Sequence, residues 1–318
     1  MKYRRLGHAG VKLSEIGLGS WLTFGGGVDE AVSRKCIRRA YDLGVNFFDT
    51  ADVYHRGAAE QIYGQELSPF RRQDIVIATK CFFPMSDGVN DRGLSRKHIL
   101  ESVAGSLKRL RTDYVDLYQC HRYDPDVELY EVVRAMDDLI RQGKVLYWGI
   151  SEWSADQIRA ACKIARDMHA PAPVSDQPEY SIAARRIETN GVQTACLDER
   201  LGMVLWSPLK QGILTGKYSK GVIPPDSRAA NETMNIFMKD VDRSLADRVD
   251  KLLPIAKRNE MTMAQLVIAW LLGRPAVTSV IIGATKVEQV EENIASVEFN
   301  PLSVADQAEI DRLFPAEE

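Results

Sequence analysis

Short apolar runs rich in β-branched and aromatic residues recur along the chain, and a longer stretch with helical periodicity follows each of them. Such runs predict strands, here at 16–19, 45–48, 75–79, 115–119, 145–150, 174–177, 203–206 and 279–282. Strands that alternate with helices in this way are typical of a parallel sheet covered by helices.

The stretches between the predicted strands carry apolar residues at the spacing of one helix face. The clearest examples are 95–110 and 129–143, and Gly143 stands where a helix stop is expected. Ser95 and Asp29 occupy the positions of N-caps. A last helical pattern near the C-terminus predicts a helix packed on the outside of the domain.

The strand–helix units favour a closed (β/α)₈ TIM barrel over an open doubly wound sheet, because no Gly-x-Gly-x-x-Gly follows the first strand. No linker or repeat interrupts residues 1–318, so we expect a single domain. Two long polar segments, 81–94 and 208–243, would lie over the C-terminal mouth of the barrel, where such loops shape substrate pockets.

Composition and charge narrow the class of protein. The net charge of −3 gives no attraction to nucleic acid or to an anionic membrane, and no apolar stretch is long enough to span a bilayer. The cysteines form no CxxC pair, and the charged N-terminus does not resemble a signal peptide. We therefore expect the protein to be located in the reducing cytoplasm. Monomers and homo-oligomers both remain open.

Candidate chemistry stands at the ends of three consecutive predicted strands. The second strand runs into Asp49 and Tyr54, the third ends in Lys80 and the fourth in His121. Each residue alone has an ordinary structural explanation, as a cap, a solvent-exposed base or a packed imidazole. A barrel brings the C-terminal ends of its strands to one rim, so together they predict an active site there.

These four side chains suit protonation of a carbonyl oxygen. A phenol has an ordinary pKa of about 10, and the Lys80 ammonium is expected to lower the pKa of Tyr54 so that it becomes a better acid near neutral pH. Asp49 would orient Lys80, and His121 would donate a hydrogen bond to the carbonyl. No side chain supplies a hydride, so the reaction requires a cofactor.

Several motifs resemble the aldo-keto reductase superfamily over about residues 3–297: GLGSWLTFGG, GVNFFDTADVY, IVIATK, VDLYQCH, and WSPLKQG with GKY and PPDSRA. YWGISEWS and DQPEYS are most similar to the branch that contains bacterial aldo/keto reductases and voltage-gated potassium channel β-subunits. The resemblance implies a TIM barrel with an N-terminal β-hairpin, and a catalytic set formed by Asp49, Tyr54, Lys80 and His121.

The resemblance also implies NADPH, with NADH less favoured, bound without a Rossmann motif. Trp206 corresponds to the aromatic residue that stacks on the nicotinamide, and Glu152 departs from the Asn or Arg usual at its position. The implied cofactor contacts run from the nicotinamide to the adenosine end: Ser20, Trp21, Asp49, Ser151, Glu152, Gln177, Trp206, Ser207, Leu209, Gln211, Gly212, Lys217, Arg228, Gly283, Thr285, Gln289, Glu292 and Asn293.

The function implied is NADPH-dependent reduction of aldehydes or ketones, with Tyr54 as the proton donor. The alternative is an NADPH-occupied, redox-sensing accessory subunit like the channel β-subunits. His121 favours the enzyme, because those β-subunits carry Asn at that position. A metal-dependent hydrolase is disfavoured, since His55, His98 and His169 lack carboxylate partners at strand ends, and we expect no metal site. The predicted substrate pocket contains Trp21, Phe82, Phe83 and Tyr123 with the 208–243 segment.

Overall fold

The strands close into a parallel barrel in this computed structural model, which describes residues 1–225, 227–231, 235 and 243–316. Within those residues eight strands follow one another around the ring in the order β10-β3-β4-β5-β6-β7-β8-β9. They are β3 (Ile16–Gly19), β4 (Phe47–Asp49), β5 (Val76–Cys81), β6 (Val115–Cys120), β7 (Val145–Ile150), β8 (Ser175–Asp176), β9 (Gly202–Leu205) and β10 (Val277–Ile282).

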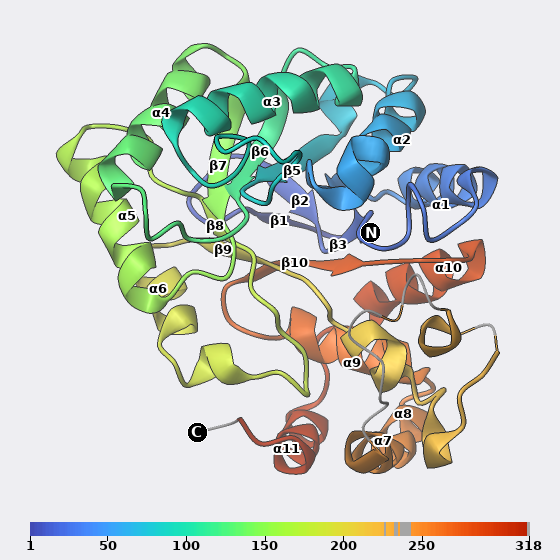
Figure 1. Cartoon of the computed structure of the whole chain (residues 1–318). Helices are drawn as coiled ribbons and strands as arrows, with labels where there is room; N and C mark the ends of the chain where they lie inside the picture. The colour runs from blue at the N-terminus through green and yellow to red at the C-terminus, as the bar shows by residue number, and fades with distance from the viewer. Residues whose placement is uncertain (226, 232–234, 236–242, 317–318) are drawn as a thin grey trace.

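At least one helix follows each barrel strand and packs around the outside of the ring (Figure 1). The predicted TIM barrel is therefore confirmed. The α-helices are α1 (Glu30–Asp42), α2 (Ala58–Leu67), α3 (Arg96–Leu110), α4 (Leu129–Arg141), α5 (Ala155–Asp167), α6 (Val192–Asp198), α7 (Arg243–Asp250), α8 (Leu253–Arg258), α9 (Met263–Leu272), α10 (Val287–Ala295) and α11 (Val304–Leu313). Short 3₁₀ turns are η1 (Tyr54–Gly57), η2 (Arg72–Asp74), η3 (Arg186–Glu188), η4 (Lys210–Thr215), η5 (Ser219–Gly221), η6 (Arg228–Ala230) and η7 (Ser296–Phe299).

The predicted helix ends agree with the structure. The side chain of Asp29 accepts hydrogen bonds from the first turn of α1, and that of Ser95 accepts one from the backbone of His98 in α3. α4 stops just before Gly143, which adopts a left-handed φ of 69°. The sixth predicted strand shrinks to the two residues of β8, although Gln177 N still donates to Ile150 O across the sheet.

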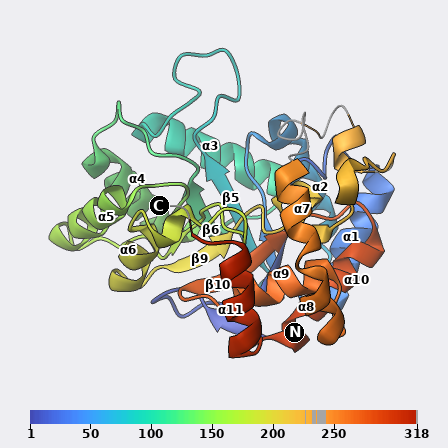
Figure 2. The same cartoon turned by 90° about the horizontal axis from the view of Figure 1, so that it is seen from below.

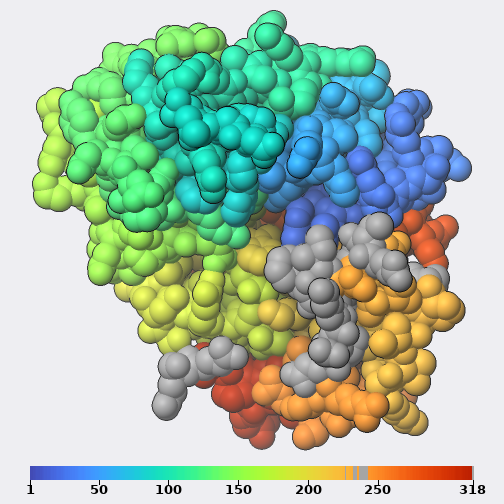
Figure 3. All heavy atoms as spheres, viewed as in Figure 1, coloured from blue at the N-terminus to red at the C-terminus, as the bar shows by residue number. Residues whose placement is uncertain are grey.

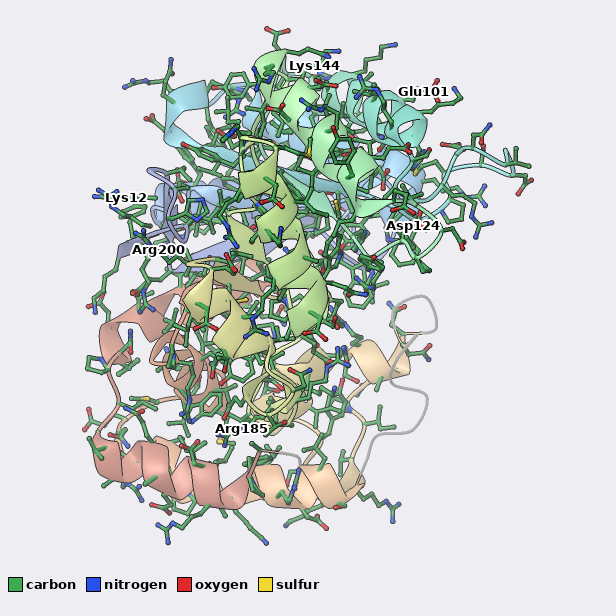
Figure 4. All side chains as sticks on the ribbon, turned by 90° about the vertical axis from the view of Figure 1, so that its left-hand side faces the viewer. Lys12, Glu101, Asp124, Lys144, Arg185 and Arg200 are labelled. Carbon is green, nitrogen blue, oxygen red and sulfur yellow. The ribbon has the colours of Figure 1, made fainter. Side chains whose placement is uncertain are left out.

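An N-terminal β-hairpin lies under the barrel. It pairs β1 (Tyr3–Arg5) with β2 (Lys12–Ser14) in antiparallel register, as the family resemblance predicts. In Figure 4, Lys12 and Arg200 lie on the side of the molecule opposite to Asp124, which follows β6. The hairpin therefore lies at the N-terminal ends of the strands, away from the mouth.

Alternation along the strands divides the barrel interior into two layers. The lower layer is an apolar cluster in which Leu6 and Leu13 of the hairpin segment pack against inward-facing strand residues such as Phe47, Ala78 and Leu117. Two residues further along the same strands, the inward side chains are polar, so the layer under the mouth is built from carboxylate, ammonium and amide groups. A larger apolar core fills the space between strands and helices.

Two connections stand over the mouth, as predicted. Figure 2 shows the 82–94 connection between β5 and α3 standing out from the barrel on that side. The second connection joins β9 to α7 and includes η4, η5 and η6. Of the predicted 208–243 segment, residues 226, 232–234 and 236–242 lie outside the described residues.

The C-terminal helices lie on the outside of the barrel, on the side opposite to α3 and α4 (Figures 1 and 3). α11 is held there by charged pairs, including Arg258 with Asp306 and Arg185 with Asp311, and by the buried ring of Phe314. This agrees with the external helix expected from the sequence. None of the described helices is long and apolar enough to cross a membrane.

Candidate active site

Asp49 and Lys80 form a buried ion pair in the polar layer under the mouth. Asp49 ends β4 and Lys80 faces the same interior from β5, because the two strands pair in parallel with Asp49 beside Ala78. Lys80 Nζ donates to Asp49 Oδ1 at 2.6 Å and to the backbone oxygen of Thr50 at 2.7 Å. The Lys80 side chain is fully buried, so this pair is shielded from solvent.

Two amides complete the surroundings of Asp49. Gln119 Nε2 and Gln177 Nε2 donate to Asp49 Oδ2 at 3.3 Å and 3.0 Å. Burial lowers the pKa of Lys80, and the adjacent Asp49 carboxylate opposes that shift. The carboxylate therefore has hydrogen bonds on both oxygens, and its charge is compensated by one buried ammonium.

Tyr54 stands over this pair at the start of η1. Lys80 Nζ lies 5.2 Å from the centre of the Tyr54 ring, and the His121 ring packs edge-on against it at 5.7 Å. No described residue forms a hydrogen bond with the Tyr54 hydroxyl, and the side chain lines the cavity at the mouth. The phenol is thus available to a molecule bound in that cavity.

The prediction that Lys80 lowers the pKa of Tyr54 was wrong. Burial raises the pKa of Tyr54 above its ordinary value, and Asp49 raises it further, while Arg122 acts in the opposite direction. The main reason is that burial disfavours the charged tyrosinate, and the Asp49 carboxylate, in direct contact with the Lys80 ammonium, disfavours it further. Tyr54 is therefore held protonated at neutral pH.

His121 presents a neutral imidazole to the same space. Burial, helped by Lys80 and Arg122, holds the pKa of His121 well below its ordinary value. Its Nδ1 is buried and has no hydrogen-bond partner in the part of the chain that the structure describes. The ring packs edge-on against Tyr54 and against Phe83, whose ring centre is 5.0 Å away.

A cavity of about 1050 Å³ opens above these residues and extends across the mouth towards β9 and β10. Most of the predicted site residues line it. They are Trp21, Asp49, Tyr54, His121, Ser151, Gln177, Trp206, Ser207, Leu209, Gln211, Gly212, Lys217, Arg228, Gly283, Thr285, Gln289, Glu292 and Asn293.

Three predicted site residues lie outside the cavity wall. Lys80 is beneath it, in the ion pair with Asp49. Ser20 is fully buried and donates to Thr50 Oγ1 at 2.8 Å. Glu152 accepts from Trp206 Nε1 at 2.9 Å and pairs with Arg186. Because Ser20 and Glu152 do not line the cavity, the function proposed below does not include them as cofactor contacts.

The predicted aromatic pocket is only partly formed. Trp21 and Phe83 line the cavity, whereas Tyr123 packs edge-on against Trp153 at 5.0 Å and Phe82 packs against Phe83. Sequence reasoning missed Arg122, which also lines the cavity. The available signal was its place directly after His121 at the end of a barrel strand.

The far half of the cavity has the donor set of a phosphate-bearing, flat-ringed ligand. Lys217 and the half-buried Arg228 supply positive charge there, and Trp206 supplies an aromatic face. Gly212 has a left-handed φ of 95°. A Cβ at this position would come within 2.8 Å of Lys217 Nζ. A bare backbone at this point is what close approach of phosphate oxygens requires.

A metal site is not apparent. Among the described residues, no group of three or more His, Cys, Asp or Glu side chains is arranged to hold a metal ion. His98, one of the imidazoles weighed from the sequence, is buried in α3 and lies 3.6 Å from one oxygen of Asp91.

Comparison with known proteins agrees with this geometry. The sequence pattern described as "Aldo/keto reductase family" matches residues 15–314. A protein of Oryza sativa subsp. japonica named "Probable voltage-gated potassium channel subunit beta" is 44% identical over 308 residues, which cover 95% of this chain and 93% of the relative. An Arabidopsis thaliana protein of the same name is 45% identical over 309 residues, with the same coverage of both chains.

A "Putative voltage-gated potassium channel subunit beta" of Schizosaccharomyces pombe is 42% identical over 304 residues, covering 93% of this chain and 88% of the relative. These names are those of the branch that the sequence motifs predicted. With a pattern that matches nearly the whole chain and relatives this similar along their length, the protein belongs to the aldo/keto reductase family.

Proposed function

We propose that this protein reduces aldehydes or ketones to alcohols with NADPH, and that Tyr54 donates the proton. The observation that carries the proposal is the unbonded Tyr54 hydroxyl in the cavity wall, beside a neutral His121 and above the buried Lys80–Asp49 pair. An acid, a neutral hydrogen-bond donor and a nearby buried cation are the groups that a carbonyl oxygen needs as it becomes an alkoxide.

Each side chain has a distinct part in this proposal. The raised pKa of Tyr54 keeps the proton on the phenol until a stronger base, the developing alkoxide, is beside it. Lys80 then stabilises the tyrosinate that remains, and Asp49 holds Lys80 in place. His121 donates a hydrogen bond to the carbonyl oxygen and so orients the substrate.

The remaining predicted contacts suit the cofactor. NADPH supplies a hydride when bound. Trp206, Ser151 and Gln177 would hold the nicotinamide end, and Lys217 and Arg228 the phosphates. The adenosine end would lie against residues that follow β10, namely Gly283, Thr285, Gln289, Glu292 and Asn293. We propose NADPH in preference to NADH because Lys286, which lines the adenosine end of the cavity, would face the additional 2′-phosphate.

The substitution Tyr54→Phe tests the proposal. We expect NADPH oxidation with an aromatic aldehyde to fall by at least about 10²-fold, because a positioned proton donor contributes that much to a rate. Binding of NADPH, followed by its fluorescence, should change little. Tyr130→Phe, on the exposed surface of α4, is the matched control and should behave like the wild type. Substantial turnover by Tyr54→Phe would refute the mechanism.

A second function, that of an accessory subunit whose NADPH occupancy is a signal, is favoured by the printed names of the relatives. The fold would be the same in both cases, so fold does not separate them. Purified protein that binds NADPH but reduces none of a panel of aldehydes, ketones and sugars would favour this second function.

A further inference from the structure

Arg122 brings a cation to the catalytic end of the cavity. It follows His121 directly after β6, and its guanidinium carbon lies 5.6 Å from the centre of the Phe83 ring. Its Nη1 donates to the backbone oxygen of His121. No described Asp or Glu pairs with Arg122, and both oxygens of the nearby Asp124 accept backbone N–H groups instead.

The topology separates this arginine from the end of the cavity assigned to adenosine. In the ring of strands β6 lies four positions from β10, and therefore directly across the barrel (Figure 1). Gly283 and Asn293 follow β10, whereas Arg122 shares its part of the wall with Tyr54 and Phe83. A molecule that reacts at Tyr54 would thus have Arg122 beside it.

The other acidic and basic groups at this end are paired, neutral or turned away from the cavity. Asp49 is paired with Lys80, and Asp52 lies behind the wall, where it accepts from Ser102 Oγ at 2.7 Å. His121 is neutral, because burial lowers its pKa. Arg122 is therefore the dominant charge that faces a substrate from this part of the described wall, and it lowers the pKa of Tyr54 through space.

We propose that Arg122 binds a carboxylate on the substrate, so that the preferred substrates are aldehydes or ketones that also carry a carboxylate group. This inference rests on the proposed carbonyl reduction. A guanidinium binds carboxylate through two parallel hydrogen bonds, which fixes direction as well as distance. Phe83 and Trp21 provide apolar walls for the part of the molecule between its carboxylate and its carbonyl.

The test compares two substrates that differ in one charge, 4-carboxybenzaldehyde and methyl 4-formylbenzoate, with NADPH as reductant. For the wild type we expect a higher kcat/KM for the acid than for the ester. Arg122→Gln should lower the acid-to-ester ratio by about tenfold or more, the effect of losing a charge-assisted hydrogen bond. Arg122→Lys, which keeps the charge without the planar fork, should lie between the two.

Arg56→Gln is the matched control, because Arg56 is an exposed arginine two residues after Tyr54 and does not line the cavity. Its ratio should equal that of the wild type. An unchanged ratio in Arg122→Gln would overturn the inference, since the comparison of two substrates in one variant cancels any general loss of activity.

A binding measurement separates this inference from the proposed function. Trp21 lines the cavity, so its fluorescence can report binding of 4-(hydroxymethyl)benzoate and of its methyl ester without turnover. If the wild type binds the acid more tightly than the ester and Arg122→Gln loses this preference, the carboxylate site is supported. This holds even if the protein reduces no aldehyde, because the absence of turnover would count only against the proposed reductase activity. Equal binding of acid and ester by the wild type contradicts the carboxylate site.

Discussion

Glu152 accepts a hydrogen bond from the indole Nε1 of Trp206 at 2.9 Å. The same oxygen accepts the backbone N–H of Glu179 at 2.5 Å, and the other oxygen pairs with Arg186. Trp206, held in this way, presents its ring to the cavity and packs edge-on against Trp21 at 6.0 Å. Glu152 thus positions an aromatic wall of the proposed nicotinamide pocket without lining it.

Replacing Glu152 by Ala should therefore weaken NADPH binding by about tenfold, since a hydrogen bond to a charged group contributes about 1.5–3 kcal/mol and part of this orients Trp206. The measurement is titration of NADPH fluorescence, together with the emission of Trp206 in the protein without cofactor. Glu152→Gln should retain most of the affinity, because an amide oxygen can still accept from the indole. Arg186→Ala, which removes only an exposed ion pair, should have little effect. Equal affinity in Glu152→Ala and the wild type would count against a positioning role.

Lys80→Met should reduce stability as well as activity. The substitution leaves Asp49 as a buried carboxylate with only the Gln119 and Gln177 amides as partners, and breaking a buried pair in this way costs about 3–5 kcal/mol. Urea unfolding followed by circular dichroism measures the loss. Adding Asp49→Asn to Lys80→Met should recover part of the stability, because the uncompensated charge is gone, while activity stays low. A double variant less stable than Lys80→Met would argue against this explanation.

Asp52 should make stability depend on pH near neutrality. Burial, with a contribution from the Glu60 carboxylate, raises the pKa of Asp52 to about 7, although the hydrogen bond from Ser102 opposes the shift. The folded protein then holds a proton that the unfolded chain releases above its ordinary pKa of 3.8. This group therefore lowers stability as the pH rises from about 4 to about 7, by up to about 1.4 kcal/mol for each pH unit.

The test for Asp52 is urea unfolding of the wild type and Asp52→Asn at pH 5 and pH 8. Asn cannot lose a proton, so the variant should gain stability relative to the wild type between the two pH values, by about 1–4 kcal/mol. Comparing the same pair of proteins at both pH values removes the pH-independent effect of the substitution on packing. An identical difference at pH 5 and pH 8 would contradict a buried acid that titrates in this window.

The neutral imidazole of His121 predicts the shape of the rate–pH profile. Because burial, Lys80 and Arg122 hold the pKa of His121 well below 6.5, its protonation should not reduce kcat/KM between about pH 6 and pH 8. His121→Asn should lower kcat by about tenfold or more, because the shorter amide side chain would donate its hydrogen bond from a different position. The rate–pH profile of this variant should keep the same shape between about pH 6 and pH 8. A loss of rate that follows a group with a pKa near 6.5 in the wild type but not in His121→Asn would show that the imidazole titrates after all.

Much of the fold could be predicted from local patterns. Helix caps such as Asp29 and Ser95, and apolar strands such as those around Leu117 and Ile281, depend on neighbours a few residues away along the chain. The sixth strand was harder, because only two residues, Ser175 and Asp176, keep regular strand geometry between irregular segments. That the C-terminal ends of the strands meet at one rim followed from the predicted barrel topology alone.

The candidate site was predictable where it follows the strand ends and not where it depends on contacts across the barrel. Tyr54 and His121 follow strands and Lys80 lies near the end of β5, so the three converge at one rim. Glu152 and Ser20 also come after strands, yet both turn towards protein partners, Trp206 and Thr50, that are distant in sequence. Nothing local to those residues distinguishes a side chain that faces a cofactor from one that supports its neighbour.

The sequence by itself determined the barrel, the order of its strands and the set of chemical groups at its mouth, because hydrophobic periodicity and the parallel topology place those groups without knowledge of distances. Only the tertiary structure decided their electrostatics. The pKa of Tyr54 depended on how deeply the phenol is buried and on its nearness to the Asp49 carboxylate, which pairs with Lys80 at 2.6 Å, and both raise it. The charge of Arg122 was likewise visible in the sequence, but its place opposite β10, beside Tyr54 and without an acidic partner among the described residues, became apparent only when the strands closed into a ring.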